Sequence, residues 1–383
     1  MALPMLRARR MERYEQAAWK HLSPLAELPQ QYQGMSEEER SRRIAAAKAK
    51  LGDRLVILGH NYQNDEIIRW SDATGDSFQL SVKAKNTKAE YIVFCGVSFM
   101  AETADLVTDG SRVVIQPSME ASCPMAGMAE MVQVYQAWEH ISSVVGESNV
   151  IPVTYVNSYA DLKAFTGEKG GVICTSANAD KAFKWAFERA EKIFFTPDKH
   201  LANNTAAKMG IPKEQVILYN PWMPKGGVSD DQLRNAKVIL WEGYCQVHER
   251  FQVHHVEEVR RDYPGIKVVT HPECRKEVCD LSDYVGSTSQ MIDWIAKQPA
   301  GSKIAVGTEI HMVKRLAKEN PDKFIVQLCG ALCLDCNAMR QVQPEYLAWV
   351  LESLVEGRVV NRIRVDDEDR ANAKLSLDRM LAL

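Results

Sequence analysis

The sequence predicts an α/β protein made of three pseudo-symmetric α/β/α domains, each with a small parallel sheet, around a central active site. Three observations lead to this fold. Short segments rich in β-branched and aromatic residues alternate with segments of helix length, which is typical of βαβ units. The same order of elements occurs three times along the chain. The first strand of each copy ends in a polar cluster, where α/β folds place their ligands.

The length of the chain indicates several domains. With 383 residues it exceeds the size that one hydrophobic core usually supports. Residues 1–50 are charged and helical in pattern, and predict an N-terminal helical extension. We expect the first α/β/α domain at 51–150, the second at 151–262, and the third, with C-terminal helices, at 263–383.

The first strand of each copy is a short apolar run that ends in polar or aromatic residues. The three segments are RLVILGHNY at 54–62, IPVTYVNSY at 151–159 and IKVVTHPEC at 266–274. Runs of this length and composition are typical of buried strands in a parallel sheet. Since the strands of a parallel sheet end at one edge, we expect the three clusters to face one shared centre.

A second strand that runs into a hydroxyl residue and a helix is expected at 91–104, 171–183 and 283–295. A third strand follows in each copy, with the sequences RVVIQPS, KIFFTPDK and KIAVGTEI. The helices are plausible by themselves, because Ser176 can cap a segment rich in helix formers. The repetition of this order indicates an internal triplication.

Composition and charge exclude other classes of protein. The net charge is −3 and no basic block occurs, so we expect no nucleic-acid partner. No apolar run reaches the roughly 18 residues of a membrane span. The start of the chain carries arginines without the apolar core and cleavage site of a secretory signal, so we expect a cytoplasmic protein.

The chain has nine cysteines, an odd number that favours free thiols, metal ligands or redox chemistry over a disulfide framework. Cys95 and Cys174 lie in apolar strand segments and are expected to be buried apolar side chains. One cysteine follows each copy's third strand, and these are Cys123, Cys245 and Cys336. They are too far apart in sequence for a local metal-binding loop, so they could share a metal only by meeting in space. Spacing alone does not select them from the nine.

Cys333 and Cys336 are the only close pair at a spacing typical of metal ligands. A single C-x-x-C fits redox thiols, half of a zinc site or chance. No second such pair exists, so a four-cysteine zinc site would need distant partners.

Eight strings give the chain a resemblance to a known family: GHNYQNDEI, GDSFQLS, CGVSFMAETA, TPDKHLANN, WEGYCQVHERF, HPEC, VGSTSQM and CLDCNAM. From about residue 51 to 383 the chain resembles the quinolinate synthases. The resemblance implies three α/β/α domains around a central site and a 4Fe–4S cluster with one cysteine from each domain. By the family pattern the cluster ligands are Cys123, Cys245 and Cys336.

The resemblance also implies a reaction. The family joins iminoaspartate to dihydroxyacetone phosphate, with loss of phosphate and water, and forms quinolinate for de novo NAD biosynthesis. Three thiolates leave one iron of the cluster without a protein ligand, and that iron can act as a Lewis acid. Because iminoaspartate is short-lived in water, functional coupling to an L-aspartate oxidase is expected.

Site residues follow from the same resemblance. Tyr62 is a candidate acid–base residue beside His60, and Glu273 is the best candidate for moving protons, with His271 beside it. Hydroxyls and N–H groups at helix starts suit carboxylates and phosphate, although such hydroxyls can also be helix caps and nothing more. The residues expected to bind substrate are His60, Ser77, Tyr155, Asn157, Ser176, His271, Glu273, Ser287 and Thr288.

Three features have no assigned step. Lys199 and His200, in TPDKHLANN, either line the cavity or are solvated. The segment around Lys225, with two glycines and nearby prolines, is interpreted as a loop or lid near the mouth. Neighbouring cysteines form a redox-sensitive pair in some members of the family, so Cys333 and Cys336 are candidates for a regulatory disulfide.

Two other functions stay open. The first is a zinc- or iron-dependent lyase or aldolase with its metal at His60, His271 and Glu273. The second is a non-catalytic iron–sulfur redox sensor, which predicts no turnover and leaves the polar strand ends without a purpose.

Overall fold

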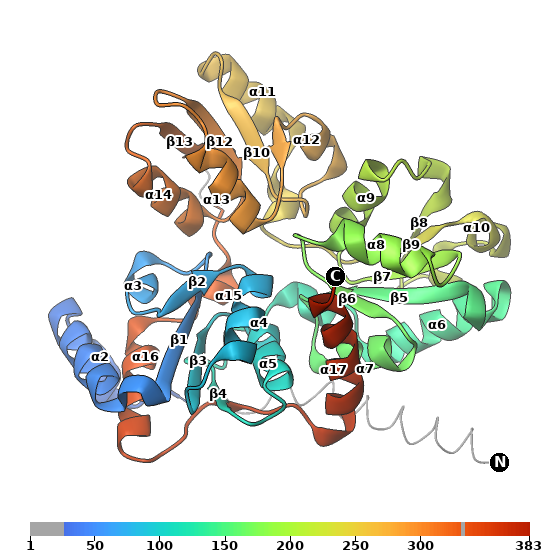
Figure 1. Ribbon diagram of the computed structural model, residues 1–383. Coiled ribbons are helices and arrows are strands. Elements are labelled where there is room, and N and C mark those ends of the chain that lie inside the picture. The colour runs from blue at the N-terminus through green and yellow to red at the C-terminus, as the bar shows by residue number, and fades with distance from the viewer. Residues whose placement is uncertain (1–26, 331–333) are drawn as a thin grey trace.

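Three sheets of mainly parallel strands, each covered by helices, make up the computed structural model, which describes residues 27–330 and 334–383 (Figure 1). Most of the expected N-terminal extension lies outside the described residues. Its described part contains α2 (Glu37–Leu51), whose N-cap Ser36 accepts a hydrogen bond from the Glu39 N–H. The predicted fold class, three α/β/α domains, is confirmed.

The first sheet has the strand order β14-β4-β3-β1-β2, and all of its pairs are parallel except β14 with β4. Its strands are β1 (Leu55–His60), β2 (Ala73–Gly75), β3 (Tyr91–Cys95), β4 (Val113–Ile115) and β14 (Arg362–Ile363). The helices between them are α3 (Asp65–Ile68), α4 (Ser77–Asn86) and α5 (Ser98–Val107). β1 lies between β3 and β2 and is almost entirely buried, which fits its apolar sequence.

The second sheet is all parallel, with the order β6-β5-β7-β9-β8. Its strands are β5 (Val150–Tyr155), β6 (Val172–Cys174), β7 (Lys192–Thr196), β8 (Val216–Tyr219) and β9 (Val238–Trp241). Its helices are α6 (Met131–Val145), α7 (Ala160–Glu168), α8 (Ala179–Phe187), α9 (Lys199–Lys208) and α10 (Asp230–Asn235).

The third sheet is also all parallel, with the order β11-β10-β12-β13. Its strands are β10 (Lys267–Thr270), β11 (Tyr284–Val285), β12 (Lys303–Gly307) and β13 (Phe324–Gln327). Its helices are α11 (Val253–Asp262), α12 (Lys276–Asp280), α13 (Thr288–Ala296) and α14 (Ile310–Glu319).

The three sheets share one core order, but the first copy is aligned differently from the prediction. The shared orders are β2-β1-β3-β4, β6-β5-β7-β9 and β11-β10-β12-β13. The counterpart of β6 and β11 is therefore β2, whereas β3, which was expected there, occupies the third place. β2 has only three residues, too few to show a strand pattern. In each copy the candidate cysteine follows the fourth strand, namely β4, β9 or β13.

The C-terminal elements differ from the expectation that they complete the third domain. After α15 (Asn337–Arg340), α16 (Pro344–Val355) packs on α2, and β14 extends the first sheet. α17 (Asp367–Leu381) packs on α7 and β6 of the second domain. The reason is the apolar face of α17, which enters the core that the first and second sheets share.

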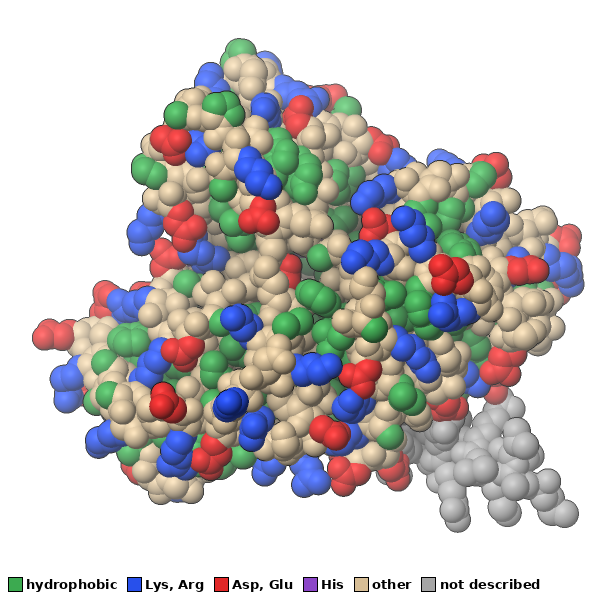
Figure 2. All heavy atoms as spheres, viewed as in Figure 1, with side chains coloured by type: hydrophobic (Ala, Val, Ile, Leu, Met, Phe, Trp, Pro, Cys, Tyr) green, Lys and Arg blue, Asp and Glu red, His purple; other side chains and the backbone are tan. Residues whose placement is uncertain are grey.

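The cores show how the domains are joined. One apolar cluster runs through the first and second sheets, whereas the third domain has separate clusters on the two faces of its sheet. The third domain lies above the other two in Figure 1. Among the described helices, none is both long and apolar enough to span a bilayer. Charged side chains of both signs are interspersed on the face shown in Figure 2.

Candidate active site

The carboxyl ends of the central strands of all three sheets border one cavity. It brings together every residue that the sequence analysis selected except Ser287. The predicted residues that line it are His60, Tyr62, Ser77, Cys123, Tyr155, Asn157, Ser176, Cys245, His271, Glu273, Thr288 and Cys336. Residues from the three copies therefore meet in space although they are far apart in sequence.

Ser287 has a structural place instead. Its hydroxyl accepts from the Gln290 N–H (3.4 Å), and its own N–H donates to Gln290 Oε1 (2.9 Å), so it is the N-cap of α13. Its neighbour Thr288 lines the cavity and accepts a hydrogen bond from Asn61 Nδ2 (2.9 Å). Ser287 is therefore a helix cap and does not line the cavity. The hydroxyl at this helix start that lines the cavity is that of Thr288.

Ser77 and Ser176 occupy comparable places at the starts of α4 and α8. Ser77 is the first residue of α4, after the N-cap Asp76. The expectation that Ser176 caps a helix is wrong, because the N-cap of α8 is Asn178. Asn178 Oδ1 accepts from the Thr175 N–H (2.7 Å) and holds the turn on which Ser176 lies. The starts of α4, α8 and α13 thus border the cavity with hydroxyls and main-chain N–H groups, which suits anionic ligands.

The three candidate cysteines come from equivalent places in the three copies. Cys123 precedes a short 3-10 helix, Cys245 follows β9, and Cys336 precedes α15. Burial raises the pKa of Cys123 to about 12 and that of Cys336 to about 11, and burial raises the pKa of Cys245 well above its ordinary range. Thiols in such a setting stay protonated until a metal displaces the proton, so they suit metal binding better than nucleophilic catalysis.

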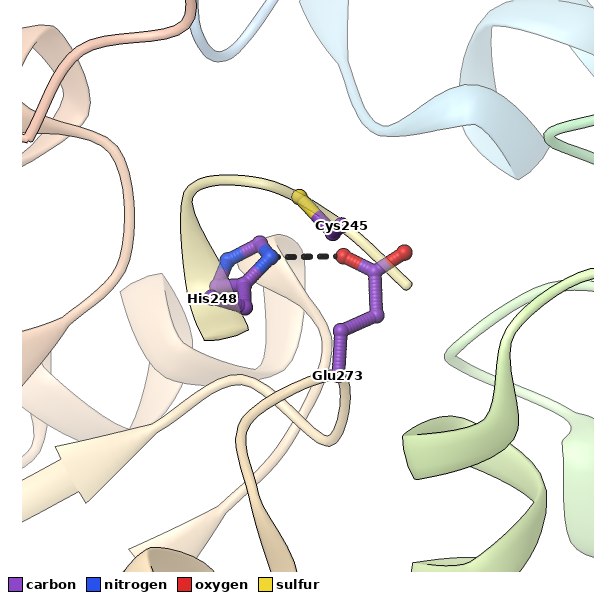
Figure 3. A group of neighbouring side chains, drawn as sticks. All are labelled: Cys245, His248 and Glu273. Carbon is purple, nitrogen blue, oxygen red and sulfur yellow. Dashed lines mark ion pairs between the residues drawn. The ribbon is translucent and has the colours of Figure 1, made fainter. Parts of the chain in front are cut away.

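Glu273 is held between two imidazoles, one of which the sequence analysis missed. Its Oε2 lies 2.7 Å from His248 Nδ1 (Figure 3). The same oxygen lies 3.2 Å from His271 Nδ1. The two rings stack with centroids 4.5 Å apart. Burial raises the pKa of Glu273, but the two imidazoles outweigh it and hold the pKa well below its usual value. Glu273 Oε1 accepts no hydrogen bond from the described residues.

A chain of hydrogen bonds continues from His248 to Tyr62. His248 Nε2 lies 3.1 Å from Thr308 Oγ1, and Thr308 Oγ1 lies 2.6 Å from Tyr62 Oη. His248 and Thr308 are fully buried, and Tyr62 is half-buried. Burial, with the charge of Glu273, raises the pKa of Tyr62 well above its usual value. Tyr62 and Glu273 are therefore linked through two further side chains, His248 and Thr308.

His60 and Asn157 present polar atoms to the cavity. Burial, with smaller contributions from Arg315 and His271, lowers the pKa of His60 to about 3, so its imidazole is neutral. His60 Nδ1 accepts from the Tyr62 N–H (3.2 Å), which leaves the hydrogen on Nε2 as a donor. Asn157 Oδ1 is buried and has no hydrogen-bond partner among the described residues.

Of the features without an assigned step, Lys199, His200 and Lys225 do not line this cavity. Lys199 Nζ pairs with Glu242 (2.5 Å), and His200 pairs with Glu249. The segment around Lys225 does not line the cavity, so the structure gives it no place as a lid. Cys336 is a free thiol, and its candidate partner Cys333 lies outside the described residues.

One group among the described residues could hold a single metal ion. Ligand atoms of Cys245, His248 and Glu273 all lie within 4.8 Å of one another (Figure 3). This set differs from the His60, His271 and Glu273 set expected for a metal-dependent lyase.

The fold and the site define an enzyme of three α/β domains with a thiol-bearing central cavity. The family described as quinolinate synthetase A protein matches residues 42–382, and the chain belongs to this family. It is 52% identical to a quinolinate synthase of Haloarcula marismortui over 359 residues, which cover 94% of this chain and 96% of the relative. The relative from Acidobacterium capsulatum is 51% identical, with 92% and 95% covered, and the one from Corynebacterium glutamicum is 48% identical, with 93% and 90% covered. The resemblance seen in the sequence is confirmed.

Proposed function

We propose that this enzyme condenses iminoaspartate with dihydroxyacetone phosphate and releases quinolinate for de novo NAD biosynthesis. Membership of the quinolinate synthetase A family supports the reaction. The observation that carries the proposal is the meeting of three thiols, one from each copy, with the chain from Tyr62 to Glu273 in one cavity.

The cofactor proposed for this site is a 4Fe–4S cluster held by Cys123, Cys245 and Cys336. These thiols fit the cluster because all three line one cavity, and no other described cysteine lines it. When bound, such a cluster supplies one iron without a protein ligand as a Lewis acid toward oxygen atoms of the substrate.

Substrate anions are assigned to the polar edge of the cavity. The neutral His60 donates from Nε2, and the side-chain amide of Asn157 offers a further polar contact. Ser77, Ser176 and Thr288 add hydroxyls beside the N–H groups at the starts of their helices. His60, the Asn157 amide and the hydroxyls are all uncharged. They therefore orient the carboxylates and phosphate without adding a further charge to the cavity that holds Glu273.

Proton movement is assigned to Glu273 and Tyr62. Glu273 is ionised, its Oε2 is held by two imidazoles, and its Oε1 accepts a proton from the substrate. Tyr62 holds the proton that an oxygen leaving as water requires. His248 and Thr308 then pass a proton between the two groups, because each contact in the chain is within hydrogen-bond reach.

A metal-dependent lyase is the second candidate, supported by the group of Cys245, His248 and Glu273. It predicts one zinc or iron per chain and no sulfide, so metal and sulfide analysis separates it from the first proposal. A cytoplasmic location and coupling to an L-aspartate oxidase stay predictions from the sequence and the resemblance.

Quinolinate formation tests the proposal directly. Protein purified without oxygen is mixed with dihydroxyacetone phosphate and with an L-aspartate oxidase that supplies iminoaspartate, and quinolinate is measured by chromatography. We expect quinolinate only when both substrates are present. Cluster-loaded protein that forms no quinolinate would contradict the proposal.

A further inference from the structure

Tyr62 and Glu273 lie on turns of the same kind, one after β1 and the other after β10. In the first turn the Tyr62 N–H donates to His60 Nδ1 (3.2 Å), and the next N–H donates to His60 O (2.9 Å). In the other turn the Cys274 N–H donates in the same way to His271 O (2.9 Å), while His271 Nδ1 faces Glu273 Oε2. Matching backbone turns therefore present the two acid–base residues.

Asn204, on α9 of the second domain, holds the carbonyls on both sides of Glu273. Its Nδ2 donates to Pro272 O and to Cys274 O, each at 2.8 Å, and also lies 3.3 Å from Cys279 Sγ. A side-chain amide nitrogen carries two hydrogens, so one asparagine can bind both carbonyls. The contact crosses from the second domain to the third, and it gives a place to the TPDKHLANN string that the cavity left unexplained.

Arg315, on α14 of the third domain, holds the carbonyls on both sides of Tyr62. Its Nη1 donates to Gln63 O (3.0 Å), and its Nη2 donates to Asn61 O. The nearest carboxylate, of Asp65, is farther away, with 3.7 Å between Nη1 and Oδ1. A guanidinium presents its N–H groups in a fixed fork, which suits two neighbouring carbonyls. This contact crosses from the third domain to the first.

The second domain's own turn offers an internal comparison. After β5, Lys163 Nζ donates to Ser158 O, and Lys163 lies on α7 of the same domain. That turn is held from within its domain, whereas the turns of Tyr62 and Glu273 are held from a neighbouring one. Both of these crossing contacts involve the third domain, which has apolar cores of its own.

We propose that Asn204 and Arg315 are positioning residues, which aim Glu273 and Tyr62 into the cavity when the third domain is seated on the other two. The bound carbonyl of Pro272 or of Asn61 fixes the peptide plane before the acid–base residue, and the N–H that donates within the turn fixes the plane after it. The bound carbonyl of Cys274 or of Gln63 fixes the next plane along the chain, so the direction of the side chain is held from both ends of the turn. Positioning matters because a displacement of about 1 Å can lower a rate about 100-fold. The inference rests on the proposed function and adds to it how the acid–base pair is assembled.

The test compares four variants with two controls. Asn204→Asp keeps the size of the side chain but cannot donate to carbonyls, and Arg315→Met removes the guanidinium. Asn204→Ser and Arg315→Lys are milder variants that carry the same test if the first two fail to fold. Asn203→Asp is the control on α9, and Lys318→Met is the control on α14, because Lys318 pairs with Asp65 (3.2 Å) without holding a carbonyl of the turn.

Hydrogen–deuterium exchange of the holoenzyme reads each turn without any turnover. We expect Asn204→Asp to accelerate exchange at 272–275 and to leave 61–64 as in the wild type. Arg315→Met should do the reverse, and both controls should leave both turns unchanged. No acceleration at the affected turn, or equal acceleration at both turns, would overturn the inference.

Quinolinate kinetics supply the second readout. Each variant should lower kcat about 10- to 100-fold while KM and the iron content stay within about twofold of the wild type, because positioning and not binding is lost. An unchanged kcat, or an equal fall in the controls, would overturn the inference. If the wild-type enzyme forms no quinolinate, only the proposed function is contradicted. The hydrogen–deuterium exchange experiment measures the two turns without turnover, so its result still tests the positioning role.

Discussion

At the scale of single residues, the site depends on how burial and hydrogen bonds set the state of each side chain. Glu273 is buried, yet two imidazoles beside its Oε2 keep it ionised, and its Oε1 is buried without a hydrogen-bond partner among the described residues. The pKa of Tyr62 is raised well above its usual value by burial and by the charge of Glu273, so Tyr62 keeps its proton. The two residues thus present a base and an acid in the same cavity at neutral pH.

Thr308 connects these two groups, so removing its hydroxyl tests the proposed proton path. Thr308→Val keeps the shape of the side chain but breaks both hydrogen bonds, and we expect kcat to fall about 10- to 100-fold. Thr308→Ser keeps the hydroxyl and should recover most of the activity. The measurement is quinolinate formation at equal iron content, and a valine variant as active as the wild type would remove Thr308 from the proton path.

His60 makes stability depend on pH. Its pKa is about 3 in the folded protein, because of burial first and then Arg315 and His271, against about 6.5 in an unfolded chain. Between these values the unfolded state binds more protons, so stability falls as the pH falls. The expected loss from about pH 7 to about pH 5 is about 2 kcal/mol. Urea unfolding of the apoprotein and of His60→Gln measures it, and an equal slope in both proteins would contradict the assignment.

The sequence predicted the residues that line the cavity better than the side chains that link them by hydrogen bonds. Strand-end clusters and family strings selected twelve lining residues, because these positions carry unusual side chains in specific strings. His248 lies in one of those strings, but a histidine three residues after a cysteine has no fixed role by itself. Thr308 follows β12 in an ordinary strand end and gave no signal. Both become visible only when the residues that follow β9, β10 and β12 are brought together in the folded chain.

At the scale of elements, the triplication was visible in the sequence but its alignment was not. Strands such as β1 and β5 were predicted because each is an apolar run of six residues, almost all of them buried. The three-residue β2 and the fourth strands β9 and β13 were missed. A short strand is fixed by pairing with its neighbours more than by its own composition. The same holds for β14, which pairs with β4 from the far end of the chain.

The first turn of α17 is held to α5 by a buried ion pair. Arg370 Nη2 lies 2.7 Å from Asp105 Oδ2, and Asp105 is 1% exposed. Arg370→Met leaves this carboxylate without its cation, so we expect a loss of about 3–5 kcal/mol in the free energy of unfolding. Arg364→Met removes only an exposed pair with Asp367 and should cost about 1 kcal/mol or less. Chemical denaturation compares the two, and equal small losses would contradict the role given to Arg370.

At the scale of the whole molecule, three copies of one α/β plan enclose a site that none of them contains alone. Each copy contributes one thiol and polar groups at its strand ends, and the C-terminal segment fastens the first two copies together. The fold class followed from the repeated order of elements. The packing partners of α16 and α17 could not be predicted. The apolar face of a helix indicates that the helix packs against the protein, but it does not indicate which element it packs against.

Iron and sulfide analysis with an absorption spectrum, on protein purified without oxygen, tests the central claim most directly. We predict broad absorbance near about 400 nm and about four irons and four sulfides per chain. The alanine variants of Cys123, Cys245 and Cys336 should each lose both, whereas Cys95→Ala should keep them. A colourless protein that carries zinc or no metal after anaerobic reconstitution, or a full cluster in all three ligand variants, would contradict the account.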